Sequence, residues 1–419
     1  MANLEAIELG LRAALFKDGR ALLEALYQQP DLNVPDNISQ PGEKCHPDRT
    51  KDIHTLFGTI TVHRHYFYHP ERQTGRFPLD QALGLIQSFS PALVRLGARA
   101  AAKEGYESAS EDLWAQAGVA IEGRQIQRLV NLVAPAVATQ LEAGERASAA
   151  PIPILYAEVD GTGVPMVAEA LAGRPGKQAD GSAKTREVKL GAIFTQTRTD
   201  EEGLPLRDHQ STTYVGSFET APDFGSRVRA EALRRGLGQA AKVVFIGDGA
   251  AWIWELARVN FPTALLILDL YHALERLHEL CEGLYGADTP WAARMQQTWP
   301  AMLKNDQVGE VIAAARRRRQ DLGSPPEDAL EKQIAYFEHH ADKMRYQTYR
   351  EQGWFYGSGV IEGGCKSVIG QRLKESGMFW TEPGATSVLN LRLALKSHRW
   401  DECWDRLHDS HYLNLRAAA

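Results

Sequence analysis

Two separate segments of the chain each form an apolar run that ends in an aspartate followed at once by glycine. They read ILYAEVDGTGV at residues 154–164 and VVFIGDGAAW at residues 243–252. Runs rich in β-branched residues and closed by a turn signal are typical of buried strands. We expect each strand to place one carboxylate, Asp160 or Asp248, just beyond its end, where open α/β sheets bind their ligands.

Two aspartates at such strand ends predict a site for hard cations. Mg²⁺ takes oxygen ligands and keeps water and substrate phosphate in its other coordination positions. Two such cations about 3.5–4 Å apart can activate an attacking oxygen and stabilise a leaving one. A site of this kind normally needs a further carboxylate. The alternative is that each Asp-Gly pair is only a turn, which is common for any single pair.

The segments around these strands predict an α/β fold. Three strands are followed by alternating strands and helices, which indicates a mixed sheet with helices packed on it. Residues 273–355 lose the strand signal and are expected to be helical. The remaining predicted elements are a linker-like stretch at 145–153, strands at 189–197 and 212–218, a helix at 221–239, and a strand that runs into a helix at 264–277.

Residues 1–84 are predicted to form a helix, a loop rich in proline and asparagine over 28–44, and a β-hairpin. The hairpin covers residues 52–69, turns at Gly58 and alternates apolar with polar positions. Its second strand carries three side chains that form either a solvated basic edge or a contact with the DNA backbone, namely His63, Arg64 and His65.

Residues 85–150 are predicted to be helical, and residues 108–134 have the pattern of a helix-turn-helix. A helix through Trp114 is broken at Gly118, and a second helix begins near Glu122. The alternative is an ordinary pair of packed helices, because many such pairs share this pattern. The second helix is expected to turn Leu129, Val130 and Val133 inward. It also carries side chains of the types that reach base edges, namely Arg124, Gln125, Gln127, Arg128 and Asn131.

Composition limits the classes of protein. A chain of 419 residues with 44% apolar content can form two or three domains. Its four cysteines form no CxxC pair, so neither a disulfide framework nor a zinc ribbon is indicated, and a reducing cytoplasm is favoured. No signal peptide or membrane span is predicted. The net charge of −6 argues mildly against a nucleic-acid partner, but a channel can be basic on an acidic protein, so local charge decides.

A third carboxylate is predicted at Glu362, within GSGVIEGGCKSVIGQRLKESGMFWT at residues 357–381. Glu362 would begin a helix with Ser358 as its N-cap, and the neighbouring glycines permit close backbone approach. The alternative is an i,i+4 ion pair with Lys366, worth only a few tenths of a kcal/mol.

A further acidic residue, Asp269, ends another predicted strand and stands three residues before His272. This spacing places both side chains at the start of one helix. The alternative for His272 is a core histidine with satisfied hydrogen bonds.

One family with similar motifs is excluded by its nucleophile. Phosphatases of the haloacid-dehalogenase type carry an Asp-x-Asp-Gly-Thr loop and a later Gly-Asp-Gly loop. Here the nucleophile position is occupied by Glu158, and the acidic position after the second loop falls near Trp252. The nucleophile is the residue such an enzyme can least afford to change.

Taken together, four motifs resemble the DDE transposases of bacterial insertion sequences, in particular the Kra-type family allied to the Mutator-like branch. They are VDGTGV, GDGAAWIWELA, FPTALLILDLYHALERL and GSGVIEGGCKSVIGQRLK. The resemblance extends from the hairpin to the NLRLALKSHRW tail. It implies an RNase H-like catalytic domain formed by residues 151–272 and 356–419, interrupted by a helical insertion domain at residues 273–355.

The same resemblance implies the chemistry. Asp160, Asp248 and Glu362 would hold a pair of Mg²⁺ ions, with Mn²⁺ as a possible substitute, and Asp269 and His272 would be accessory. Water would cut the element's ends, and the freed 3′-hydroxyl would attack target DNA. The implied partners are double-stranded DNA, as terminal inverted repeats and target, and further copies of the chain in a homodimer or larger assembly. The implied location is the bacterial cytoplasm, at the nucleoid.

Several side chains are candidate DNA contacts. The arginine run from Arg316 to Arg319 is either a phosphate-binding surface or a solvated helix face. Near Glu362 the candidate phosphate contacts are Lys366, Arg372 and Lys374, and Trp380 is a candidate for base stacking.

Relatives often follow the hairpin with paired cysteines that suggest a zinc knuckle, and this chain has YFYHPERQTG instead. The spacing of the remaining candidate ligands is irregular, so zinc is not predicted; they are Cys45, His46, His54 and His69.

Two other functions remain open. A catalytically idle descendant acting as a DNA-binding protein would be expected to have lost a carboxylate. A non-specific nuclease of the same fold would not need a DNA-reading N-terminal region or an assembly that holds two ends.

Overall fold

The structure is a computed structural model that describes residues 3–27, 39–143, 151–174, 176, 178, 183–323 and 329–409. Most of the predicted loop at 28–44 and of the linker-like stretch at 145–153 lies outside these residues. The chain forms two compact units. The first runs to Ala143 and includes Pro383–Leu395 and the chain from Arg399 onward. The second comprises the sequence between these parts, up to Glu382, with Lys396–His398.

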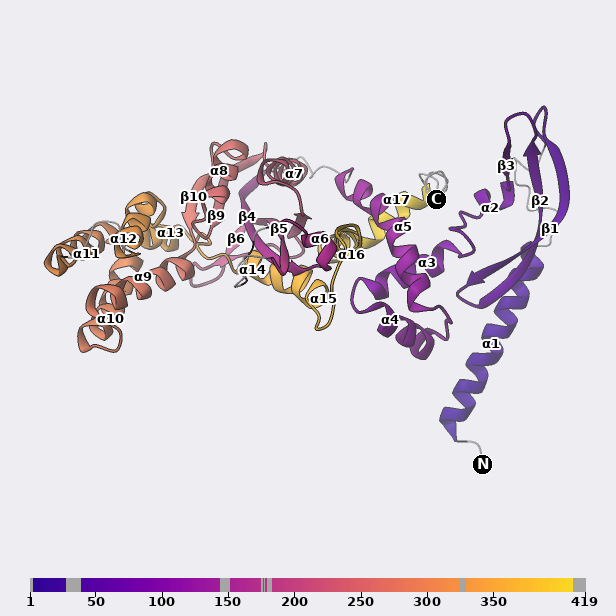
Figure 1. The fold of residues 1–419 in the computed structure, drawn as a ribbon, viewed down its shortest axis with the longest axis horizontal. Coiled ribbons are helices and arrows are strands. Elements are labelled where there is room, and N and C mark those ends of the chain that lie inside the picture. The colour runs from indigo at the N-terminus through magenta and orange to yellow at the C-terminus, as the bar shows by residue number, and fades with distance from the viewer. Residues whose placement is uncertain are drawn as a thin grey trace. The chain divides into compact units, whose positions relative to one another are not determined.

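A five-stranded mixed sheet is the centre of the second unit, as the sequence predicted (Figure 1). Its strand order is β10-β9-β4-β5-β8. β4 is parallel to β9, and β9 is parallel to β10, whereas β4, β5 and β8 pair antiparallel in turn. The strands are β4 (Ile152–Pro165), β5 (Thr185–Gln196), β8 (Thr213–Ser217), β9 (Ala240–Gly247) and β10 (Leu265–Leu268). A separate two-stranded ribbon joins β6 (Arg198–Thr199) to β7 (Pro205–Leu206).

Helices cover both faces of this sheet. Because successive side chains of a strand point to opposite faces, Leu155 and Ala157 pack against one layer of helices while Tyr156 packs against the other. The first layer is α7 (Ala221–Arg234) and α8 (Ala251–Asn260), and the second begins with α9 (Leu270–Tyr285). Figure 1 shows α14 (Gly359–Gly364) and α15 (Gln371–Leu373) on the opposite side of the sheet from α7. A short α6 (Ala168–Leu171) follows β4.

The end of β4 differs from the prediction. The strand was expected to stop at Asp160, but it continues to Pro165 because β5 pairs with it as far as Pro165 opposite Thr185. Its pairing with β9 ends earlier, where Glu158 lies opposite Ile246. Asp160 therefore lies within a strand, at the place where the neighbouring strand stops, and Asp160-Gly161 is not a turn.

The second Asp-Gly pair is a turn. Asp248 follows the last residue of β9, and Gly249 has a φ of +101°, a conformation that glycine adopts without steric cost. The two aspartates are therefore presented by different backbone conformations.

The segment predicted to be helical forms helices joined by short turns in its described part. A buried core that includes Leu277, Trp299, Val311 and Phe337 joins its helices to α9 and to the sheet. The helices are α10 (Pro290–Lys304), α11 (Val308–Leu322), α12 (Ala329–His340), a 3-10 turn (Ala341–Lys343) and α13 (Tyr346–Glu351).

The first unit contains the predicted hairpin. β1 (Lys44–Thr55) and β2 (Gly58–His69) pair antiparallel and are joined by a tight connection before Gly58, whose φ is +109°. β3 (Thr74–Arg76) adds a third strand, and Ile53, Ile60 and Val62 form the core beneath. The neighbouring helices are α1 (Leu4–Tyr27), α2 (Pro78–Ala82) and α3 (Pro91–Ala101).

The predicted helix-turn-helix segment forms two helices in the first unit. α4 (Tyr106–Asp112) continues as a π-helical turn (Leu113–Ala117) and ends at Gly118, which is left-handed with a φ of 67°. α5 (Gly123–Glu142) follows with Glu122 as its N-cap. Leu129, Val130 and Val133 are buried, as predicted. The last helices of the chain are α16 (Glu382–Lys396) and α17 (Trp400–Asp409). Among the described helices, none is both long enough and apolar enough to cross a membrane.

Candidate active site

Asp160 and Asp248 come from neighbouring parallel strands. Glu158 lies opposite Ile246 in the register of β4 and β9, so residues 160 and 248 both lie two positions further along. Asp160 accepts the backbone N–H of Gly161 at 2.6 Å on Oδ1. Asp248 Oδ1 accepts the N–H of Ala250 at 2.9 Å, which closes its turn. Burial raises the pKa of Asp160, and the nearby charge of Asp248 raises it further. Two carboxylates that repel each other in this way favour a cation between them.

Asp269 is a buried N-cap. It directly follows β10, its side chain is fully buried, and Oδ1 accepts the backbone N–H groups of Tyr271 and His272 at the start of α9. Oδ2 accepts the N–H of Ser358 at 2.7 Å. Burial acts to raise the pKa of Asp269, but hydrogen bonds from His272 and Ser358 outweigh it and the pKa is lowered. Asp269 is thus a charged residue whose oxygens are already engaged by backbone donors.

His272 is not the core histidine that the sequence left open. Its side chain is 39% exposed, and Nδ1 lies 3.7 Å from Asp269 Oδ2. Pairing with Asp269 raises the pKa of His272 to about 9, against the effect of burial, and Asp248 and Glu275 add to the rise.

Glu362 is carried by the first turn of α14 and joins this group. Its Oε1 accepts the hydroxyl of Ser358 at 3.2 Å. Ser358 holds the predicted N-cap position, but its side chain makes no capping bond to the helix and is directed to the carboxylate instead. Lys366 is exposed, and Glu362 is not paired with it. The candidate ligand atoms of Glu362, Asp269 and His272 all lie within 4.8 Å of one another.

One buried carboxyl group was not recognised as part of this site from the sequence. Glu158 is fully buried on β4, and its Oε2 accepts the backbone N–H of Ile361 at 2.8 Å. Oε1 is buried without a hydrogen-bond partner in the described structure. Burial raises the pKa of Glu158 to about 8. The available signal was a glutamate inside an apolar strand, two positions before Asp160 and therefore on the same face.

The oxygen atoms of this cluster fit a hard cation. Asp269 has its oxygens committed to backbone N–H groups, which makes it an orienting residue rather than a free ligand. Asp160, Asp248 and Glu362 are half-buried, and each offers carboxylate oxygens of the type that Mg²⁺ prefers. Cys365 touches Asp160 Oδ2 through its thiol at 3.4 Å, a weak donor that a cation would displace easily.

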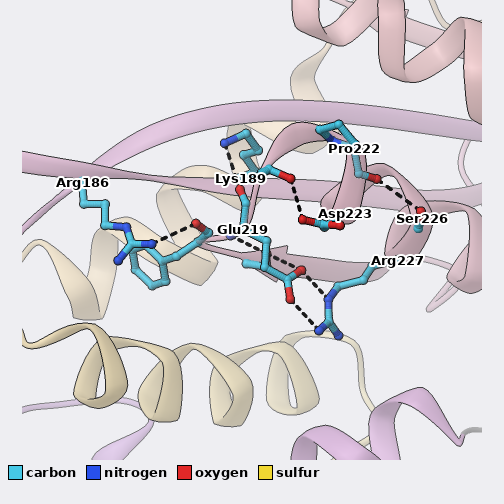
Figure 2. A network of polar contacts seen from close by, with 10 residues as sticks. Arg186, Lys189, Glu219, Pro222, Asp223, Ser226 and Arg227 are labelled. Atoms are coloured by element: carbon cyan, nitrogen blue, oxygen red, sulfur yellow. Dashed lines mark hydrogen bonds and ion pairs between the residues drawn. The ribbon is translucent and has the colours of Figure 1, made fainter. Parts of the chain in front are cut away.

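A network of polar contacts fixes the strand that lies beside Asp160 (Figure 2). Lys189 on β5 stands opposite Gly161, and its Nζ donates to the backbone carbonyl of Glu219 at 3.3 Å. Glu219 receives both Nε and a terminal nitrogen of Arg227, at 2.6 and 2.7 Å. Arg186, further along β5, donates to the carbonyl of Phe218. These basic side chains of β5 were not predicted from the sequence, because they lie in a strand and form no cluster along the chain.

Two predicted DNA contacts near Glu362 are buried. Arg372 is 0% exposed, lies over the ring of Trp380 and donates to Sδ of Met378. Trp380 is 6% exposed, and its Nε1 donates to the carbonyl of Leu373 at 3.1 Å. The prediction of a phosphate contact at Arg372 and of base stacking at Trp380 is therefore wrong, because the two side chains pack on each other. Lys374 is exposed and contacts the Thr162 hydroxyl.

The arginine run is mostly engaged within the helical segment. Arg316 pairs with Glu331 and Glu338. Arg318 donates to the carbonyl of Leu284, and Arg319 is only 6% exposed. Arg317 is exposed. Arg316, Arg318 and Arg319 therefore contact other parts of the helical segment or are buried, and whether the run binds phosphate or is a solvated face stays a prediction.

The side chains predicted to read DNA on α5 are mostly exposed. Arg124, Gln127, Arg128 and Asn131 are on the surface of the helix. Gln125 has a different contact, because its Oε1 accepts the backbone N–H of Glu122 at 3.0 Å and completes a capping box.

Three of the four side chains considered as zinc ligands lie near one end of the hairpin, namely Cys45, His46 and His69. His54 lies near the other end and contacts Thr59.

Comparison with known proteins identifies the family of the chain. The model of an uncharacterised protein family, UPF0236, matches residues 1–402. No curated protein matches. Among solved structures, the chain is similar to one described as the Drosophila P element transposase strand transfer complex, with 12% sequence identity and a TM-score of 0.28, over 78% of this chain and 82% of that chain.

Proposed function

We propose that this chain, which belongs to the uncharacterised protein family UPF0236, is a DNA transposase of the DDE type. It would cut phosphodiester bonds at the ends of its own element and join the 3′ ends to target DNA. The observation that carries the proposal is that Asp160 and Asp248 occupy matching positions on neighbouring parallel strands, while α14 carries Glu362 beside Asp269 and His272. The charge of His272 acts to lower the pKa of Asp160, and the charge of Asp248 raises the pKa of His272, so the ring lies near both aspartates.

The strand order supports the RNase H-like fold that the Kra-type resemblance implies. In that fold the first aspartate is on the first strand, the second follows the fourth strand, and the glutamate is on a late helix. Asp160 lies on β4, the first strand of the five in chain order, and Asp248 follows β9, the fourth. Glu362 lies on α14, which follows the helical segment in the sequence and so comes after all five strands of the sheet.

The proposed cofactor is Mg²⁺, held by Asp160, Asp248 and Glu362, with Mn²⁺ as a substitute. When bound, two such ions stabilise charge on the attacking and leaving oxygens of an in-line displacement. The chain's own residues orient this site. Asp269 fixes the start of α14 through the backbone N–H of Ser358 and lies beside His272. No covalent protein intermediate is required by either displacement.

The proposed partners are double-stranded DNA and further copies of the chain. Arg124, Gln127, Arg128 and Asn131 on α5 are exposed side chains suited to reading bases and binding phosphates. In the second unit, the exposed Lys366 and Lys374 lie on the segment that carries Glu362. Two element ends must be cut and joined together, so at least a homodimer is proposed, acting at the bacterial nucleoid.

The test is Mg²⁺-dependent cleavage of DNA that carries the terminal sequences of the element encoding the chain. Asp160→Asn, Asp248→Asn and Glu362→Gln keep side-chain size and remove charge, and each is expected to abolish cleavage while DNA binding persists. Glu255→Gln is the matched control, since Glu255 is exposed on α8 and pairs only with Arg258. Cleavage of any DNA without preference for the ends would favour the nuclease instead. Binding of the ends without cleavage by the wild-type chain would favour the DNA-binding protein.

A further inference from the structure

We propose that Glu158 is a positioning residue of this site, and that Glu158 and Asp269 together clamp the first turn of α14 so that Glu362 is held in the proposed cation site. This inference rests on the proposed function. It assigns a role to a buried carboxyl group that is not one of the three proposed cation ligands.

The clamp consists of two hydrogen bonds to the start of one helix. Glu158 Oε2 accepts the N–H of Ile361 at 2.8 Å, and Asp269 Oδ2 accepts the N–H of Ser358 at 2.7 Å. The first N–H groups of a helix have no partner within the helix itself. The two acceptors come from different elements, β4 and the start of α9, so together they fix the helix start relative to the sheet. Glu362 is the next residue after Ile361.

The side chain of Ser358 does not cap the helix. It occupies the N-cap position, where a serine hydroxyl usually accepts a helix N–H. Here the hydroxyl donates to Glu362, and no side-chain cap bond is made. The two buried carboxyl groups supply the acceptors in its place, which leaves the serine free to orient the glutamate.

The same helix reaches the first aspartate one turn later. α14 continues directly into a π-helical turn (Cys365–Gly370), and the thiol of Cys365 lies 3.4 Å from Asp160 Oδ2. Gly364 packs so closely that an added Cβ would lie 2.6 Å from the ring of Tyr214 and 3.1 Å from Leu190 on the sheet. A shift at the helix start would therefore move Glu362 and the contact with Asp160 together.

Burial of the Glu158 carboxyl group at this position is energetically unfavourable. It is fully buried in a strand whose neighbours are apolar, and its Oε1 has no hydrogen-bond partner in the described structure. A buried polar atom without a partner reduces stability and calls for an explanation. The bond to Ile361 provides one, because Glu158 stands on the same face of β4 as Asp160 and ties the third carboxylate to the strand of the first.

The experiment compares three substitutions at one position. Glu158→Gln keeps the volume and an acceptor oxygen and is expected to cleave element-end DNA much as the wild type does. Glu158→Met keeps a similar volume but has no acceptor for Ile361, and its kcat is expected to fall by about 100-fold, the order of loss that a misplacement of 1 Å can cause. Glu158→Asp keeps the carboxylate but shortens its reach, and a smaller loss in the same direction is expected.

Two further measurements separate positioning from general damage to the fold. Binding of Mn²⁺ to the full-length chain without DNA, measured by electron paramagnetic resonance, should weaken in Glu158→Met and Glu158→Asp and be restored in Glu158→Gln. Affinity for DNA with EDTA present should be the same in all three. If Glu158→Met does not fold, the comparison of Glu158→Asp with Glu158→Gln gives the same test.

The outcomes distinguish the two proposals. Normal cleavage and normal Mn²⁺ binding in both Glu158→Asp and Glu158→Met, with an active wild type, would overturn the clamp and leave the transposase proposal in place. A wild-type chain that neither binds Mn²⁺ nor cuts DNA would overturn both. Loss in Glu158→Gln equal to that in Glu158→Met would also overturn the clamp, because the acceptor oxygen would then be irrelevant.

Discussion

The guanidinium carbon of Arg372 lies 5.0 Å from the centre of the Trp380 ring, and both side chains are buried. The indole nitrogen of Trp380 donates to the carbonyl of Leu373. This pair joins the segment that follows Glu362 to the strand segment at Pro165 and Met166, with which Trp380 forms a β-bridge. Its role is therefore to hold the end of the Glu362-bearing segment in place.

Arg372→Ala is expected to lower the free energy of unfolding by about 1–3 kcal/mol, because it removes a buried side chain and its packing on Trp380. Thermal and urea unfolding of the full-length chain would measure this loss. Lys374→Ala is the matched control: Lys374 is exposed, and its loss should weaken DNA binding and reduce its salt dependence with little effect on stability. A stable Arg372→Ala chain with weakened DNA binding would contradict this assignment.

Two neighbouring glutamines on α5 should behave differently. Gln125→Ala removes the capping-box bond to Glu122 and is expected to cost about 0.5–1 kcal/mol of stability, without changing which DNA sequence is preferred. Gln127→Ala removes an exposed side chain and is expected to change sequence preference without loss of stability. Unfolding curves and selection of binding sites from random DNA would measure the two effects. Equal stability loss in both variants would contradict the assignment of Gln125 as a cap.

Asp269 is expected to matter for stability as well as for activity. Asp269→Ala leaves the N–H groups of Tyr271, His272 and Ser358 without their acceptor in a buried place, which should cost about 2–4 kcal/mol. Unfolding in EDTA would measure this without any contribution from a bound cation. Glu279→Ala on the exposed face of α9 is the control and should change stability by less than about 0.5 kcal/mol. A loss no larger than that of the control would show that Asp269 is a replaceable ligand rather than a cap.

Much of the sheet and of the acidic cluster could be predicted, because short stretches of the sequence indicate where each strand, turn and helix begins or ends. An apolar run closed by Asp248-Gly249 predicts a strand and a turn, and α9 begins where the strand that precedes Asp269 ends. The end of β4 could not be predicted in the same way. Whether a strand continues past Asp160 depends on pairing with β5, which lies elsewhere in the sequence.

The burial and contacts of single side chains could not be predicted from neighbouring residues in the sequence either. Lysine and arginine near a predicted catalytic helix suggest DNA contacts, and Lys374 is indeed exposed. Arg372 carries the same charge two residues earlier but is buried, because the ring of Trp380 packs against its guanidinium group. Glu158 illustrates the reverse case: its significance depends on Ile361, which meets it only in the folded chain.

The ion pair between Glu43 and Arg76 should make the first unit sensitive to acid. Arg76 donates Nε and a terminal nitrogen to the two carboxylate oxygens of Glu43 at 2.8 and 2.9 Å, joining the start of β1 to β3. This pairing lowers the pKa of Glu43 from 4.5 to about 2. A lowered pKa in the folded state means that the stabilisation is complete above the unfolded value of 4.5 and is lost as the pH falls toward 2. Glu43→Gln should therefore lower the Tm near neutral pH, and the difference from the wild type should shrink at about pH 3.

Glu71→Gln, an exposed change in the same hairpin, should have no effect on the Tm at either pH. A difference between wild type and Glu43→Gln that stays constant between the two pH values would show that the pair does not stabilise the hairpin through its charge.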